Sequence, residues 1–324
     1  MTAAPLILIF GMHRSGTSAL ARALSLGGVA LPSTLLESRA DNTEGYWESA
    51  RMVAMNEEIL RALGGHALAA FTREMRARER SARATIVREL ERVYERECPR
   101  DRVVVVKDPR MCLLAEAHLD AARRQGRRVH AVVLVRDAGS AAGSLVARNV
   151  VSREYAGLLW RQHVLFAEAA TRAIPRTLVR HRTFLADPVG VVTAIRDAVG
   201  CNEENATPLE ADKVRAWVHP DRVYWSPERA ASTDDEREVD QAVFSDTADR
   251  AALLDALRER AFDDCGRVDP GCVPLWLILQ SNATIGWAQV AALAMDRGVS
   301  AAPGAVDAFL RGEALRFGGL GSES

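Results

Sequence analysis

Residues 11–18 combine the residue types that bind an anion. Two glycines permit a tight turn whose backbone N–H groups point inward. Thr17 and Ser18 add hydroxyl donors at the start of an expected helix, whose N-terminus also favours negative charge. The cation Arg14 lies inside the turn, whereas nucleoside triphosphatases have a lysine at the position of Thr17. The segment is therefore predicted to bind phosphate or sulfate, in a manner that differs from ATP-binding loops.

Positively charged residues also follow three further apolar runs. The second run leads into Lys107–Arg110, the third ends before Arg136, and the fourth ends before residues 180–182. In open α/β sheets, ligands bind at the carboxyl ends of the strands. We therefore expect these groups to meet Arg14 at one edge of the sheet and to form a local site for a polyanion.

The composition is almost neutral, so any basic site must come from a local cluster of positive residues and not from the charge of the whole chain. Among 324 residues, 42 are Lys or Arg and 43 are Asp or Glu, which argues against a general nucleic-acid binder. The lysines are only Lys107 and Lys213, so a lysine inside a motif indicates a need for a compact charge. The five cysteines form no CxxC pair, which argues against a zinc site or disulfide framework and favours a reducing compartment.

Apolar runs separated by helical patterns predict the fold class. Strands are expected at residues 5–10, 102–106, 128–135 and 176–179. Helices are expected at residues 17–26, 46–63, 72–97, 111–124, 138–150, 154–172 and 188–199. Because the strands are apolar throughout, we expect an α/β fold with a parallel sheet flanked by helices on both faces.

Four motifs, in this order along the chain, resemble the PAPS-dependent sulfotransferases, in particular the bacterial branch with a GMHRSGTS loop. The resemblance covers about residues 5–200. It includes the loop at 11–18, the segment DNTEGYWE at 41–48, the segment KDPR at 107–110, and Arg136 with Ser144 eight residues later. It implies a P-loop-like fold and transfer of a sulfuryl group from 3′-phosphoadenosine-5′-phosphosulfate (PAPS) to an acceptor hydroxyl, with release of PAP and no metal ion.

The resemblance also implies roles for individual residues. Those implied to hold the donor are Gly11, His13, Arg14, Ser15, Gly16, Thr17, Ser18, Arg136, Ser144 and His181. Arg14 and the loop amides would bind the 5′-phosphosulfate, Arg136 and Ser144 the 3′-phosphate, and His181 the adenine. Arg14 and Lys107 are implied in catalysis, with Lys107 stabilising charge that develops on the bridging oxygen.

The catalytic base is the point at which the chain departs from many cytosolic relatives. Their base is a histidine, and Pro109 stands at that position and cannot accept a proton. Other branches use a glutamate near the start of the helix that follows the loop's helix. Glu48 matches this placement best, before Glu44 and then Glu37. The helix dipole also favours a carboxylate in a first turn, so Glu48 has a purely structural explanation as well.

The composition of the chain changes after residue 225, where a polar and acidic stretch is followed by helical patterns. We therefore predict an α/β domain at 1–225, a polar linker or excursion at 226–246, and a helical C-terminal region at 247–324 with helices at 247–264, 273–297 and 302–316. The helical region could cover the acceptor site, complete the core or form a homodimer contact. We expect no leader and no membrane span, which makes a cytoplasmic protein the expectation.

Two other functions stay open at this point. A P-loop kinase or nucleoside triphosphatase would use ATP and Mg²⁺, with Asp108 or Asp137 after an apolar strand as a metal ligand. A non-catalytic nucleotide-binding module would keep the fold without turnover. If the chain is a sulfotransferase, the expected acceptor is a saccharide, a lipid or a small secondary metabolite, not a nucleic acid. Tyr46 and Trp47 are candidates for lining its cleft or for the core.

Overall fold

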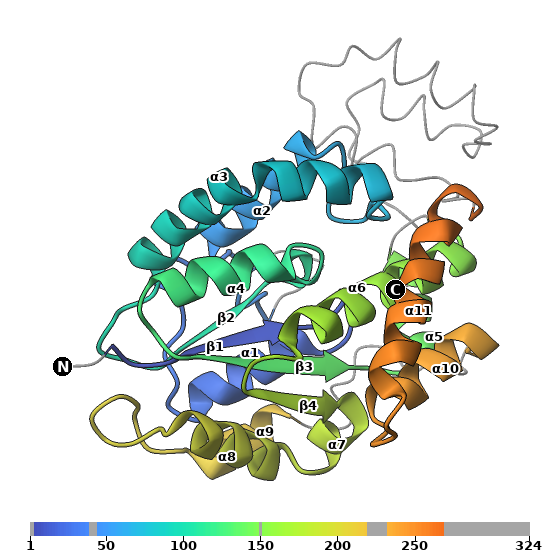
Figure 1. Ribbon diagram of the computed structural model, residues 1–324. Helices are drawn as coiled ribbons and strands as arrows, with labels where there is room; N and C mark the ends of the chain where they lie inside the picture. The colour runs from blue at the N-terminus through green and yellow to red at the C-terminus, as the bar shows by residue number, and fades with distance from the viewer. Residues whose placement is uncertain (1–2, 39–43, 149–150, 219–231, 269–324) are drawn as a thin grey trace, which may run out of the picture. The chain divides into compact units, whose positions relative to one another are not determined.

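Four apolar segments pair as parallel strands in the order β2-β1-β3-β4 (Figure 1). They are β1 (Leu6–Phe10), β2 (Val104–Lys107), β3 (Val129–Val135) and β4 (Arg176–Arg180). The structure is a computed structural model and describes residues 3–38, 44–148, 151–218 and 232–268. The predicted parallel α/β sheet is confirmed, with small shifts at the strand ends.

The register of the sheet brings the carboxyl ends of the strands together. Ile9 lies beside Lys107, Phe10 beside Val133, and Val135 beside Arg180. Every residue of β1, β2 and β3 is buried, as expected for strands that are covered on both faces. Side chains that follow these strands therefore start from one edge of a rigid, fully packed sheet.

Helices cover both faces of the sheet (Figure 1). One face packs against α1 (Thr17–Leu26), α8 (Pro188–Val199) and α9 (Ala211–Trp217), and the other packs against α4 (Ala115–Arg124) and α6 (Arg153–Thr171). The helices α2 (Ala50–Ala62) and α3 (Arg73–Glu97) form a further layer beside α4. The remaining elements are the short 3-10 helices η1 (Pro109–Cys112) and η3 (Asp264–Gly266), and α5 (Ala138–Arg148), α7 (His181–Ala186), α10 (Asp234–Val243) and α11 (Arg250–Asp263).

The start of α2 differs from the predicted helix at 46–63. The helix begins at Ala50, and the Ser49 hydroxyl caps it by accepting a hydrogen bond from the Met52 N–H at 3.1 Å. Trp47, with φ of 56°, cannot continue a helix. Glu48 therefore precedes the cap, and the explanation of this residue as a first-turn carboxylate is wrong.

Residues 226–246, predicted as a polar linker, contain a regular helix. Thr233 and Glu236 form a reciprocal capping box at the start of α10. The buried Glu236 carboxylate forms an ion pair at 2.8 Å with Arg153 of α6. The helix predicted at 247–264 is confirmed as α11. Both helices belong to one compact unit with the sheet, Met1–Arg148 with Arg153–Asp269, while the helices predicted at 273–297 and 302–316 lie outside the described residues.

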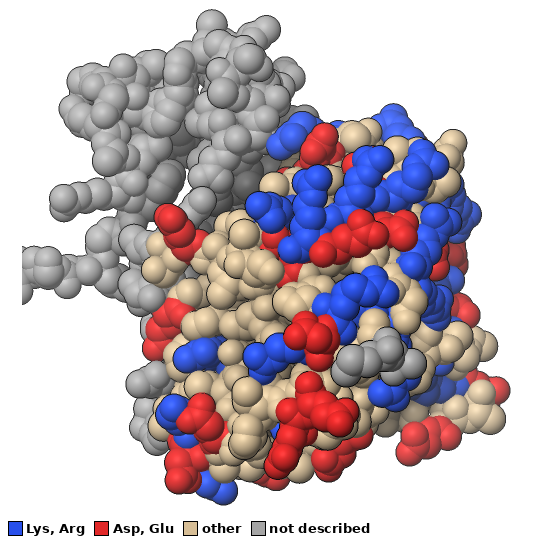
Figure 2. All heavy atoms as spheres, turned by 90° about the vertical axis from the view of Figure 1, so that its left-hand side faces the viewer, with Lys and Arg blue, Asp and Glu red and all other residues tan. Residues whose placement is uncertain are grey.

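The surface near the amino ends of the strands is rich in arginine. Figure 2 shows basic side chains gathered on part of this face, with acidic side chains between them. On α3, exposed Arg88, Arg92 and Arg96 alternate with glutamates, and Arg92 pairs with Glu89. This agrees with the solvated helix that its charge pattern predicts. None of the helices within the described ranges is long and apolar enough to cross a membrane.

Candidate functional site

The loop between β1 and α1 has the backbone of an anion cradle. Arg14 and Gly16 both have left-handed conformations, with φ of 67° and 87°. Gly16 is the N-cap of α1 and has no side chain that could cap the helix, so the first amides are left for an external anion. Gly11 is required for a different reason, because an added Cβ would lie 2.6 Å from Thr17 Cγ2 and 2.9 Å from the Leu134 oxygen.

The residues implied for the two ends of the donor lie together. Arg14 Nε donates a hydrogen bond to the Ser144 hydroxyl at 3.0 Å, and Arg136 Nη1 donates to the Arg14 carbonyl at 2.9 Å. Behind them, the indole N–H of buried Trp160 donates to the Arg136 carbonyl at 3.0 Å. The predicted meeting of the loop with the end of β3 is therefore present in the structure.

His181, the first residue of α7 directly after β4, contributes a ring rather than a charge. A Cβ on Gly16 would lie 2.6 Å from His181 Cδ2, so the imidazole packs directly on the loop. Burial and the nearby Arg136 charge lower the pKa of His181 to about 4, which keeps the ring neutral at neutral pH. Arg180 instead pairs with Asp240 at 2.8 Å and lies over the Phe244 ring at 3.7 Å. The expectation that all of residues 180–182 supply charge to the site is thus corrected for Arg180.

Lys107, the last residue of β2, joins the loop to a buried carboxylate. Its Nζ donates to the Ser18 hydroxyl at 3.0 Å and forms an ion pair with Glu48. Arg110 Nη1 lies 4.0 Å from the other Glu48 oxygen. Burial raises the pKa of Glu48 above its ordinary value, against the opposing charge of Lys107. The carboxylate therefore lies between two cations beside the phosphate loop.

The other two glutamates considered as bases differ from Glu48 in their surroundings. Glu37 is exposed and Glu44 is half-buried, whereas Glu48 is only 6% exposed. A carboxylate that is removed from water responds more strongly to neighbouring charge and is a stronger base. Of the three glutamates, Glu48 is thus the buried one.

Asp108 is committed to a buried hydrogen-bond network. Its Oδ2 accepts from Asn56 Nδ2 at 2.9 Å, and its Oδ1 accepts from Arg110 Nη1 at 2.8 Å. Asn56 Oδ1 contacts His118 Nε2 at 2.9 Å, and His118 Nδ1 contacts the Tyr94 hydroxyl at 3.0 Å. Both carboxylate oxygens of Asp108 thus hold neighbouring side chains, which argues against a role as the magnesium ligand of a kinase.

Two pairs of aromatic residues near the loop pack edge-to-face. His13 packs edge-to-face on His163 at 6.0 Å, and burial lowers the pKa of His13 well below its ordinary value. Trp47 packs edge-to-face on Trp217 at 6.2 Å, under the Arg22 guanidinium, and contacts the apolar core beside α1. Trp47 is therefore mainly a core residue, and His163 is a neighbour of the loop that sequence reasoning missed.

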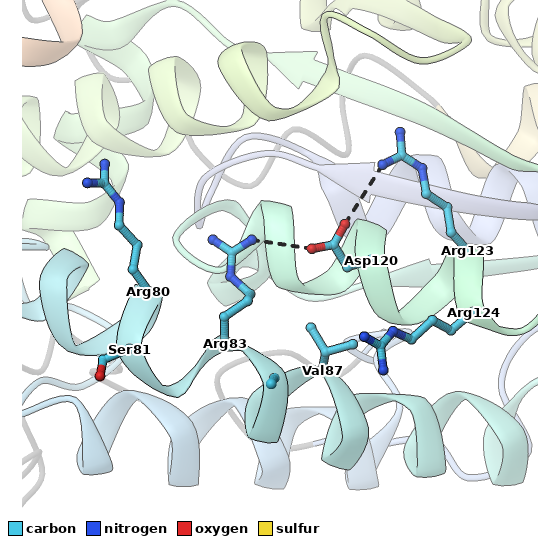
Figure 3. A pocket seen from close by; sticks show the side chains of 8 residues that line it. Arg80, Ser81, Arg83, Val87, Asp120, Arg123 and Arg124 are labelled. Atoms are coloured by element: carbon cyan, nitrogen blue, oxygen red, sulfur yellow. Dashed lines mark hydrogen bonds and ion pairs between the residues drawn. The ribbon is translucent and has the colours of Figure 1, made fainter.

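A hollow of about 530 Å³ lies elsewhere, between α3 and α4 (Figure 3). Its lining consists of Arg80, Ser81, Arg83, Ala84, Val87, Asp120, Arg123 and Arg124. Asp120 of α4 links the two helices through its contact with Arg83 of α3 at 3.4 Å, and it also contacts Arg123 of its own helix at 3.8 Å. None of the predicted site residues lines this hollow.

In the described ranges, no group of three or more His, Cys, Asp or Glu side chains could hold a metal ion.

Comparison with known proteins identifies solved structures only. No family model and no curated protein match the chain. The sulfotransferase domain from the Synechococcus PCC 7002 olefin synthase aligns at 16% identity and a TM-score of 0.39, over 79% of this chain and 94% of that domain. A sulfotransferase from Alicyclobacillus acidocaldarius aligns at 16% and 0.36, over 82% and 100%. The sulfotransferase domain from the curacin biosynthetic pathway aligns at 13% and 0.37, over 79% and 98%.

Proposed function

We propose that this chain is a sulfotransferase that moves a sulfuryl group from PAPS to an acceptor hydroxyl and releases PAP. The observation that carries the proposal is the double contact of Lys107. Its ammonium group touches both Ser18, at the end of the anion loop in the first turn of α1, and the buried Glu48. One cation therefore contacts both the loop that would bind a polyanionic donor and the carboxylate that would accept a proton.

The residues present fit the donor. Arg14 and the uncapped amides of α1 would hold the 5′-phosphosulfate, and Arg136 with Ser144 would hold the 3′-phosphate. When bound, PAPS supplies the sulfuryl group and a phosphate leaving group. Because a loose transition state forms few new bonds, most of the catalysis would come from positioning and from charge stabilisation.

Lys107 and Glu48 would divide the remaining work. Lys107 Nζ would stabilise negative charge as it develops on the leaving oxygen. Glu48 would accept the acceptor's hydroxyl proton on a carboxylate oxygen, and its burial makes it a stronger base than an exposed glutamate. The expected acceptors stay a saccharide, a lipid or a small secondary metabolite. The unpaired cysteines Cys98, Cys112, Cys201 and Cys265 of the described ranges support action in a reducing, cytoplasmic compartment.

A two-step experiment tests the proposal. Thermal unfolding is first compared with PAP and with ATP plus Mg²⁺, because a ligand that binds the folded state raises the melting temperature. We expect the larger shift with PAP, and a larger shift with ATP plus Mg²⁺ would favour the kinase. The chain is then incubated with ³⁵S-PAPS and a panel containing a saccharide, a long-chain alcohol and a phenol. Binding of PAP without transfer to any acceptor would favour the non-catalytic module.

A further inference from the structure

A second buried carboxylate lies behind Glu48, on a different element. Glu97 is the last residue of α3, and its side chain is 1% exposed. Its Oε2 accepts hydrogen bonds from the Thr34 N–H at 3.0 Å, the Thr34 hydroxyl at 2.7 Å and the Ser49 hydroxyl at 2.9 Å. Its Oε1 accepts from Arg51 Nη1 at 2.9 Å. Four donors from two distant parts of the chain thus converge on one carboxylate.

The partners of Glu97 belong to the two arms of the segment that leads to Glu48. The arms pair in an antiparallel manner, with Leu35 bridged to Ser49. The Leu36 N–H donates to the Glu48 carbonyl at 2.9 Å, and the Ala50 N–H donates to the Thr34 carbonyl at 3.1 Å. Glu97 holds one residue of each arm, so it fixes the backbone on both sides of the pairing.

We propose that Glu97 is a positioning residue that sets Glu48 against Lys107. The inference rests on the proposed function only where it concerns turnover. Ser49 directly follows Glu48, and its hydroxyl is shared between the α2 cap and Glu97. Without the Glu97 carboxylate, Ser49 and Thr34 lose a common acceptor, and only the backbone pairing of the two arms still holds Glu48 in place. Small displacements of catalytic groups lower rates strongly, by up to about a hundredfold for 1 Å.

A matched control separates positioning from general stability. Glu168 of α6 is also a fully buried carboxylate held by arginines, with contacts to Arg172 at 2.8 Å, Arg176 at 3.2 Å and Arg250 at 3.0 Å. It contacts none of the site residues described above. Loss of either buried carboxylate leaves hydrogen-bond donors without their acceptor, including one arginine for Glu97 and three for Glu168, and destabilises the fold. Only loss of Glu97 should disturb Glu48.

The two lysines of the chain make the test direct. Protein labelled with ¹³Cε,¹⁵Nζ-lysine gives one signal from Lys107, which contacts Glu48, and one from Lys213, whose side chain is 64% exposed. The Glu48→Gln variant marks the position of the Lys107 signal when the ion pair is lost. The signals are then compared in wild type, Glu97→Gln and Glu168→Gln.

We expect the Lys107 signal of Glu97→Gln to move toward its position in Glu48→Gln, with Lys213 unmoved and Glu168→Gln like wild type. If Glu97→Gln does not fold, Thr34→Val, which removes the 2.7 Å donor, should give a smaller shift in the same direction. A wild-type Lys107 signal in a folded variant would overturn the inference.

With an acceptor that wild type sulfates, kcat of Glu97→Gln should fall about tenfold or more while its PAP affinity is kept. Failure of PAP to bind wild type would refute the proposed function and leave the NMR result valid.

Discussion

At the level of single residues, the ammonium group of Lys107 is held in one position by its surroundings. The side chain is 1% exposed, and its ammonium lies between a hydroxyl and a carboxylate from two different elements. An ammonium is a compact charge with three rotatable donors, whereas a guanidinium is a planar fork that requires more room. A chain with only two lysines therefore keeps one where the space suits a point charge.

Replacement of that charge should be costly for turnover. Lys107→Ala is expected to lower kcat at least about a hundredfold, because charge on the leaving oxygen would lose its stabilising partner. Lys213→Ala removes the other, exposed lysine and should leave kcat unchanged. Steady-state rates with ³⁵S-PAPS measure both variants. Wild-type turnover in folded Lys107→Ala would exclude the proposed role of this residue.

The acid limb of the pH–rate profile should report Glu48. The proposed base must be ionised, and burial raises its pKa, so activity should disappear as the pH falls through a value above the ordinary glutamate pKa of about 4.3. Glu48→Gln should lower kcat at least about a hundredfold and abolish this limb. Initial rates between pH 4 and 9 measure the limb. Unchanged turnover in Glu48→Gln would shift the role to Glu44.

Arg136 should act on donor affinity. Its guanidinium supports the loop carbonyl of Arg14 and lies at the place proposed for the 3′-phosphate. Hydrogen bonds to charged groups are worth about 1.5–3 kcal/mol, so Arg136→Ala should weaken PAP binding about tenfold to a hundredfold. Arg92→Ala, an exposed arginine of α3 that pairs with Glu89, is the control and should bind PAP like wild type. Isothermal titration calorimetry decides, and equal affinities would contradict the assignment.

At the level of elements, the turn before α1 depends on Gly16. The residue has φ of 87°, and an added methyl group would lie 2.6 Å from the His181 ring. Gly16→Ala should therefore lower PAP affinity by more than about tenfold, because the loop must move away from His181 at the start of α7. Gly126→Ala is a matched control, since Gly126 has φ of 66° but open space around it. It should cost about 1–2 kcal/mol of stability from backbone strain and keep PAP affinity. Calorimetry and thermal unfolding separate the two effects.

The elements also show which features could be predicted from the sequence. The strands β1, β2 and β3 were predictable because each is a mainly apolar run that stays buried along its whole length, whereas β4 is mostly half-buried. The helix α10 was missed because its acidic first turn resembles a linker. The Thr233–Glu236 capping box and the apolar Val239 and Val243 were its available signals. Glu97 could not be predicted, because its partners Thr34 and Ser49 lie 63 and 48 residues earlier and no local pattern joins them.

At the level of the whole molecule, surface charge and site charge are separate. Exposed arginines gather on the face near the amino ends of the strands (Figure 2). Lys107 is buried, and Arg14 and Arg136 are half-buried, at the carboxyl ends. Buried charges are screened less by salt and act more strongly on a bound anion. The proposed chemistry therefore depends on a few packed cations, and the net charge of -1 gives no indication of them.

The described unit has its own core and contains every residue proposed to bind the donor. We therefore predict that donor binding needs no residue beyond this unit. The core cluster beside α1 contains residues from Ala4 to Val218, and α11 joins the unit through stacking of Phe262 on Phe166 at 5.1 Å. A fragment of residues 1–268 should unfold in one cooperative transition and bind PAP within about threefold of the full chain, since a domain with its own core can fold alone. Calorimetry of both proteins tests this. A folded fragment that no longer binds PAP would place a donor-binding residue in 269–324, and the site would then include the C-terminal region.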